Sequence, residues 1–178
     1  MMDILLILIA VLALLSFILK CSFFPRWGAI AASLALAASA WAAIPWLTRQ
    51  EASAFSSWVT DPDHMLDAAV CIVLEAVIMT AFCFSRPSGR FRPLRFYPGL
   101  LAFPAAVWIL SRVLFSRPGM DFNRFAWVAA LAVLLIALGG SRLLAKMVPE
   151  EDIRLEGLFL INLFLLLSSV AATGAITF

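Results

Sequence analysis

Charged side chains are scarce in this sequence. Only 13% of its 178 residues are Asp, Glu, Lys or Arg, whereas soluble domains carry about 25%. Hydrophobic residues make up 64% of the chain, against roughly 45 to 50% in soluble domains. This composition excludes a water-soluble fold and predicts an all-α integral membrane protein.

Histidine and cysteine are also rare. The chain has one His and three Cys, so the His pair of a metalloprotease is excluded, and neither a phosphate-binding Gly loop nor Gly-x-Ser-x-Gly occurs. Cys21, Cys71 and Cys83 are widely spaced and odd in number, which argues against a disulfide framework. We therefore expect a chain that is not catalytic alone, and its metal ligands, if it has any, stay undefined.

Apolar windows fill most of the chain. They fall near residues 3–19, 28–47, 67–84, 99–116, 125–145 and 157–177. A helix needs about 20 apolar residues to cross a hydrocarbon core of roughly 30 Å, so six crossings use about 120 residues. We predict six transmembrane helices in a single transmembrane domain, residues 1–178.

Basic residues gather in alternate loops. One set has nine members: Lys20, Arg26, Arg86, Arg90, Arg92, Arg95, Arg142, Lys146 and Arg154. The other has three: Arg49, Arg117 and Arg124. Basic residues stay on the cytoplasmic side during insertion, so we predict an inner (cytoplasmic) membrane protein with both termini on the outer side. The basic loop around Arg90 contains aromatic residues, which indicates contact with anionic lipid headgroups and not with nucleic acid.

A short internal similarity predicts a repeat. Residues 24–32 align with residues 122–130 with four identities in nine positions. Halves of three helices have opposite orientations, so the prediction is a 3+3 inverted repeat of the kind that forms midplane sites from broken helices. Pro25 and Gly28 would mark a break of the first helix, and Pro104 a bend in the fourth. Chance similarity between Ala-rich helices is the alternative.

Polar residues recur along the third apolar segment. His64, Asp67, Cys71, Glu75 and Met79 follow at spacings of three or four, which places them on one helical face. Glu75 is near mid-depth, where an ionised carboxyl is costly. We hypothesise that Glu75 lies on an ion or proton path with Asp67 at its outer mouth. The alternatives are a hydrogen bond between two helices or an ion pair with Arg112.

Two further residues complete the candidate ion path. Arg112 is near the outer end of the fourth helix, where it could also extend to the lipid headgroups. Asn162 shares a face of the last helix with Ser169 and Thr173. We expect these three polar side chains to form hydrogen bonds with neighbouring helices.

Several short motifs resemble a known family. The segment Phe24-Pro25-Arg26-Trp27-Gly28 stands where that family has Cys-Pro-x-x-Gly, and Ser141-Arg142-Leu143-Leu144 is similar to its Arg-x-Arg-Leu motif. Pro149, Gly157, Leu160, Ile161, Ser168 and Gly174 continue the similarity. The family is that of the six-helix membrane subunits of the Rnf and Nqr electron-transport complexes, which are built as inverted three-helix repeats.

The resemblance implies a function. It predicts a small subunit of a hetero-oligomeric, ion-translocating, redox-linked complex, in contact with other membrane subunits and lipid. In the family, cysteines of two subunits hold an iron-sulfur cluster at their interface. Here Phe24 and Leu110 occupy the expected cysteine positions, and Cys21 lies three residues upstream of the first. The cluster is therefore lost or held by the partner, with Cys21 as the remaining candidate ligand.

Two other functional classes remain open. One is a small independent transporter or substrate-binding membrane component, with a ligand pocket near Glu75, Asn162 and the predicted outer loop from Thr48 to Leu66. The other is a structural membrane subunit without an ion path.

Overall fold

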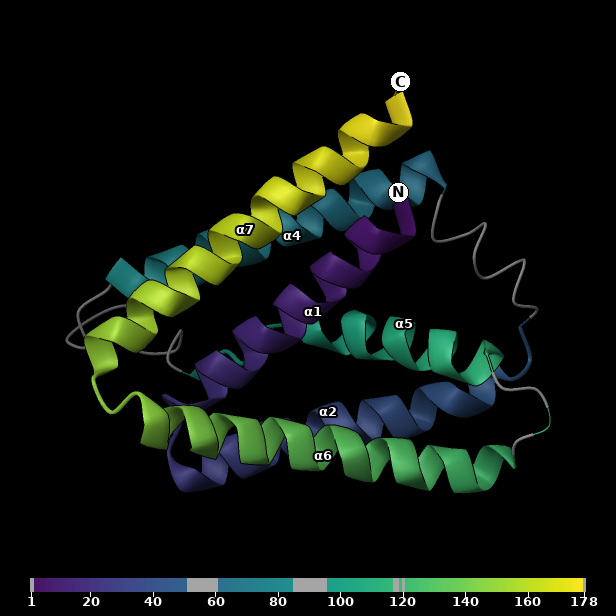
Figure 1. The fold of residues 1–178 in the computed structure, drawn as a ribbon, viewed down its shortest axis with the longest axis horizontal. Coiled ribbons are helices and arrows are strands. Elements are labelled where there is room, and N and C mark those ends of the chain that lie inside the picture. The colour runs from purple at the N-terminus through teal and green to yellow at the C-terminus, as the bar shows by residue number, and fades with distance from the viewer. Residues whose placement is uncertain (1, 51–60, 85–95, 117–118, 120, 178) are drawn as a thin grey trace.

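The chain folds into helices only, within the part that the structure describes. The computed structural model describes residues 2–50, 61–84, 96–116, 119 and 121–177. Its helices are α1 (Met2–Cys21), α2 (Arg26–Leu47), α4 (Pro62–Phe84), α5 (Ala102–Phe115), α6 (Phe122–Met147) and α7 (Glu151–Thr177) (Figure 1). No β-strand occurs among these residues. The predicted all-α class is confirmed.

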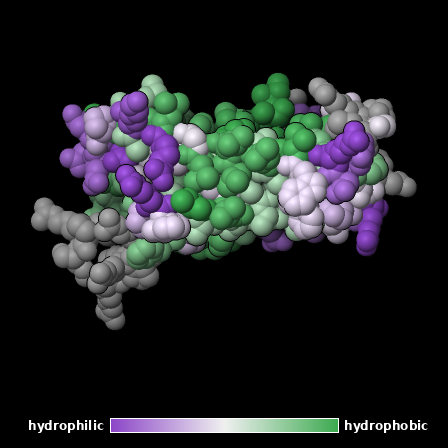
Figure 2. Space-filling view, turned by 90° about the horizontal axis from the view of Figure 1, so that it is seen from below, coloured by the Kyte–Doolittle hydropathy of each residue, from purple (hydrophilic) through white to green (hydrophobic). Residues whose placement is uncertain are grey.

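Five of the six helices are long and apolar enough to cross a membrane. The exception is α5, whose 14 residues rise only about 21 Å at 1.5 Å per residue, less than the roughly 30 Å of a hydrocarbon core. Figure 2 shows a hydrophobic band between two hydrophilic ends of the molecule, as a bilayer requires. The chain is therefore a multi-pass helical membrane protein, but the prediction of six full-length crossings is wrong for the fourth.

Helix α1 lies between two groups of helices (Figure 1). It packs against α7, which also packs along α4, and on its other side against α5 and α6. Helices α2 and α6 pack closely because their buried faces are mostly small, which allows close approach of the backbones. The small residues of these faces are Ala29, Ser33, Ala37 and Ala40 on α2, and Ala126, Ala129, Ala137 and Ser141 on α6.

Two helices begin at an aspartate cap, a few residues before the apolar window that predicted them. The Asp61 carboxylate accepts a hydrogen bond from the Asp63 amide at 3.0 Å, and Asp121 accepts one from Asn123 at 3.0 Å. Such caps satisfy amides that have no partner within the helix. Helices α4 and α6 consequently start earlier than residues 67 and 125, where the apolar windows begin.

The prolines do not act as predicted. Helix α1 is continuous, so the predicted break in the first helix is wrong. Pro25 is instead the N-cap of α2, with Gly28 in the first turn of that helix. Pro104 is the third residue of α5, where its missing N–H would have no partner in the helix, so it does not bend α5.

Two stretches that carried sequence predictions lie outside the described residues. They are residues 51–60, in the loop predicted on the outer side, and residues 85–95, in the basic loop predicted on the inner side, which contains Arg86, Arg90, Arg92 and Arg95. The start of α1 and the end of α7 are on the same side of the molecule (Figure 1).

Candidate functional site at the start of α5

Glu75 of α4 is buried, with only 5% of its surface exposed. Its Oε2 accepts hydrogen bonds from the backbone amides of Leu100 and Leu101, both at 2.8 Å. The Tyr97 hydroxyl donates to the same oxygen at 3.3 Å. A carboxyl group within a membrane-crossing helix is thus held by the loop that precedes α5.

This contact supplies the cap that α5 lacks. Leu101 is the N-cap residue of α5 and provides no side-chain hydrogen bond of its own. The first amides of a helix have no partner within it, and they form its positive end. Glu75 therefore satisfies two amides and places a carboxyl at the positive end of the helix dipole. Because Glu75 lies near the middle of α4, α5 begins inside the molecule and runs from there to one edge (Figure 1).

Gly99 makes room for the carboxyl group. Its φ is +95°, a backbone conformation that favours glycine. A Cβ atom at this position would lie 2.9 Å from Oε1 of Glu75 and 3.1 Å from Cε of Met79. Both the backbone conformation and the close approach of Glu75 therefore require glycine here.

Arg112 does not reach Glu75. Its guanidinium instead forms an ion pair with Asp3 at the start of α1, and both side chains are exposed. Asp67 is exposed as well. Eight residues separate Asp67 from Glu75, which rotates the two side chains about 80° apart on a helix of 3.6 residues per turn. The structure therefore brings neither Asp67 nor Arg112 into the buried site.

Asn162 joins two other helices. Its side-chain amide donates to Ser16 Oγ of α1 at 3.0 Å and to the Leu158 carbonyl of α7 at 2.8 Å. This is the helix-to-helix hydrogen bond that the sequence predicted. Thr173, in contrast, donates to the Ser169 carbonyl of its own helix at 3.1 Å. Asn162 and Glu75 thus belong to different contacts, one between α1 and α7 and one between α4 and α5.

Cys21 does not fit the cluster that the resemblance implies. It is the last residue of α1 and only 1% exposed, so its thiol is not presented to a partner subunit. Iron-sulfur clusters are held by several thiolates. Within the described residues, His, Cys, Asp and Glu form no group of three or more that could hold a metal ion. We derive no chemistry from an iron-sulfur cluster at this position.

Two buried cations were not recognised as a site from the sequence. Lys20 Nζ lies 2.7 Å from the centroid of the Phe82 ring, and Arg154 Cζ lies 4.9 Å from that of Phe23. The two rings meet edge to face, with their centroids 5.7 Å apart. Arg154 also donates to the carbonyl and the hydroxyl of Ser22, both at 3.1 Å. The sequence assigned both cations to loops, whereas the structure uses them to join α1, α4 and α7 through cation–π contacts.

Comparisons of the chain with protein-family models, curated proteins and solved structures found no significant match. The resemblance to Rnf and Nqr subunits therefore stays a prediction.

Proposed function

We propose that this chain is an ion-handling membrane protein in which Glu75 binds and releases a proton at the start of α5. One observation supports the proposal: a buried carboxyl group near the middle of α4 caps the start of α5, a helix of 14 residues that is too short to cross a membrane. Discontinuous helices form the ion and substrate sites of many transporters. Ionisable residues at this depth are costly, and they mark ion paths and proton relays.

The donors around Glu75 favour a proton over a metal ion. Two amides and one hydroxyl point at Oε2, together with the positive end of α5, and these repel a metal cation. Oε1 accepts none of these three bonds and lies beside Gly99. A proton on Oε1 would leave the three bonds at Oε2 in place. Both protonation states then fit one geometry, so proton exchange does not require the start of α5 to rearrange.

The helix contacts support an inverted repeat. If α1, α2 and α4 correspond to α5, α6 and α7, each helix packs against its counterpart, and the contact of α1 with α6 is matched by that of α5 with α2. The contact of α1 with α7 has no equal counterpart, because α5 and α4 do not pack along each other and are joined by the hydrogen bonds of Glu75. We take α5 as the shortened member of the repeat, which makes the fourth predicted helix the broken one.

We also propose a narrower function, which rests on the proposed inverted repeat. Together with the sequence resemblance, this repeat supports a non-catalytic subunit of a redox-linked complex of the Rnf or Nqr kind, bound to other membrane subunits. The proposed location is the inner membrane. The two ends of the chain lie on the same side of the molecule (Figure 1), and the excess of basic residues in alternate loops favours the outer side for both.

Proton flux into vesicles tests the role of Glu75. The purified protein, with any copurifying subunits, is reconstituted with a pH-sensitive dye inside, and a pH gradient is applied. Glu75→Gln keeps the shape and an acceptor oxygen but cannot exchange a proton, so we expect flux to fall at least tenfold. Glu156→Gln, an exposed position on α7, is the matched control. Normal proton flux in a folded Glu75→Gln protein would show that Glu75 only caps α5 and does not carry protons.

Copurification tests the narrower proposal. The chain is isolated from its native membrane in mild detergent, and its partner proteins, iron and flavin are measured on one sample. Related six-helix subunits with flavin or iron-sulfur partners would support a redox-linked complex. A lone, colourless protein would exclude it and favour an independent transporter, while leaving the flux experiment on Glu75 unaffected.

A further inference from the structure

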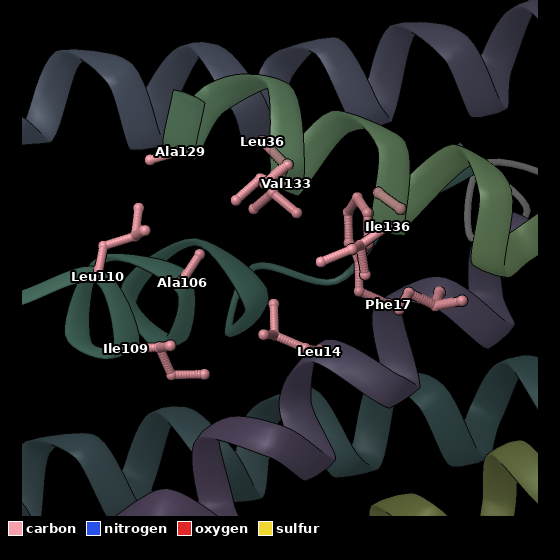
Figure 3. A pocket seen from close by; sticks show the side chains of 12 residues that line it. Leu14, Phe17, Leu36, Ala106, Ile109, Leu110, Ala129, Val133 and Ile136 are labelled. Carbon is pink, nitrogen blue, oxygen red and sulfur yellow. The ribbon is translucent and has the colours of Figure 1, made fainter. Parts of the chain in front are cut away.

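A cavity of about 180 Å³ lies between α1, α2, α5 and α6 (Figure 3). Its lining side chains are all apolar, and Figure 3 shows Phe17, Leu36 and Ala106 around it together with Val133 and Ile136 of α6. The cavity is separate from the Glu75 site, whose polar contacts lie before the start of α5.

Small side chains leave this space open. Helices α5 and α6 both pack against α1 and α2, and alanines face the gap between them. The alanines in the lining are Ala106, Ala129, Ala132 and Ala137. A larger residue at any of these positions would extend into the cavity.

The lining excludes water and polar ligands. A buried water molecule needs two to four polar partners, and apolar cavities of about 150 Å³ stay dry and take up molecules such as benzene. A polar ligand would also lose its hydrogen bonds to water without replacement. The occupant that this cavity can accept is therefore a hydrocarbon.

The cavity reaches the lipid-facing surface. On α6, Ile136 is 61% exposed and Ala132 is exposed, whereas Phe17 and Leu36 on the far side of the cavity are each 1% exposed. This exposed side belongs to the hydrophobic part of the molecule, which the chains of bilayer lipids surround. We propose that the cavity binds the end of an acyl chain from a membrane lipid, which enters past Ala132 and Ile136. This site is independent of the proposed function of Glu75.

Photocrosslinking tests the proposal. The whole protein is placed in nanodiscs with phosphatidylcholine that carries a diazirine near the end of one acyl chain, and adducts are mapped by mass spectrometry after illumination. We expect adducts on the peptides that contain Phe17 and Leu36, although both side chains are buried. A yield on these residues no higher than that on other buried core residues would overturn the proposal.

Variants that fill the cavity give a second measurement. Ala106→Leu narrows its interior and Ala132→Leu narrows its mouth, so adducts on Phe17 and Leu36 should fall at least fivefold in each. If Ala106→Leu does not fold, Ala132→Leu alone tests whether the cavity binds the lipid chain. Ala38→Leu, at an exposed position of α2 outside the lining, is the matched control and should leave the yield unchanged. Equal yields in all variants would refute the site.

Discussion

Gly99→Ala should destabilise the protein through two separate effects. A non-glycine residue in the left-handed region costs about 1 to 2 kcal/mol. The new methyl group would also lie 2.9 Å from Glu75 Oε1, so the carboxyl group has to move away from the amides of Leu100 and Leu101. Losing one such hydrogen bond costs about 1 to 3 kcal/mol. We expect the free energy of unfolding to fall by about 2 to 5 kcal/mol.

Gly119 offers a matched control. Its φ is +92°, close to that of Gly99, but no heavy atom lies within 4 Å of where its Cβ would be. Gly119→Ala therefore carries the backbone cost of about 1 to 2 kcal/mol without the steric one. The difference between the two variants, about 1 to 3 kcal/mol, isolates the contact with Glu75. Unfolding in mixed detergent micelles with increasing dodecyl sulfate, followed by circular dichroism, measures both.

One outcome would refute this reasoning. If Gly99→Ala is no less stable than Gly119→Ala, the carboxyl group of Glu75 is not held against the backbone at Gly99. A double variant gives a second check. In a Glu75→Ala background, the loss of unfolding free energy caused by Gly99→Ala should shrink to the loss caused by Gly119→Ala.

Three other substitutions distinguish buried from exposed contacts, and the same unfolding titration measures each. Asn162→Leu removes the hydrogen bond between α7 and α1 and should cost about 0.5 to 1.7 kcal/mol; no change would show that the bond does not hold these helices together. Asp3→Asn breaks the exposed ion pair with Arg112 and should change stability by less than about 1 kcal/mol, so a larger loss would contradict its exposed placement. Phe82→Leu removes the ring beneath Lys20 and should cost about 2 kcal/mol or more because that cation is buried, whereas a neutral effect would argue against the cation–π contact.

The sequence predicted where helices are but not where all of them begin. Hydropathy windows detect apolar residues, and they located all six helices, with ends that differ from the structure by six residues at most. They missed the polar first turns of α4 and α6, which start at the capping residues Asp61 and Asp121, and the acidic first turn of α7 with Glu151 and Asp152. The caps themselves can be read from a sequence, since Asp before Pro62 and before Phe122 is a typical helix start.

The candidate site was predictable only in part. A carboxyl group at mid-depth identifies Glu75 as unusual whatever surrounds it. Its partners could not be predicted, because they are the backbone N–H groups of Leu100 and Leu101, and every residue except proline has a backbone N–H. Of the two alternatives that the sequence offered, the ion pair with Arg112 is wrong, and the hydrogen bond between two helices is present, with backbone donors. The adjacent Pro98 and Gly99 were the one local sign that a helix starts there and not earlier.

The cap on α5 also has a consequence for biosynthesis. In the hydrocarbon core, each backbone amide without a partner costs several kcal/mol, so α5 cannot settle with its first turn inside the bilayer until a carboxyl group is there to receive its amides. That group belongs to α4, which leaves the ribosome before α5 does. The order of synthesis thus presents the acceptor first. A circular permutation that placed α5 ahead of α4 would leave the new helix start uncapped during insertion.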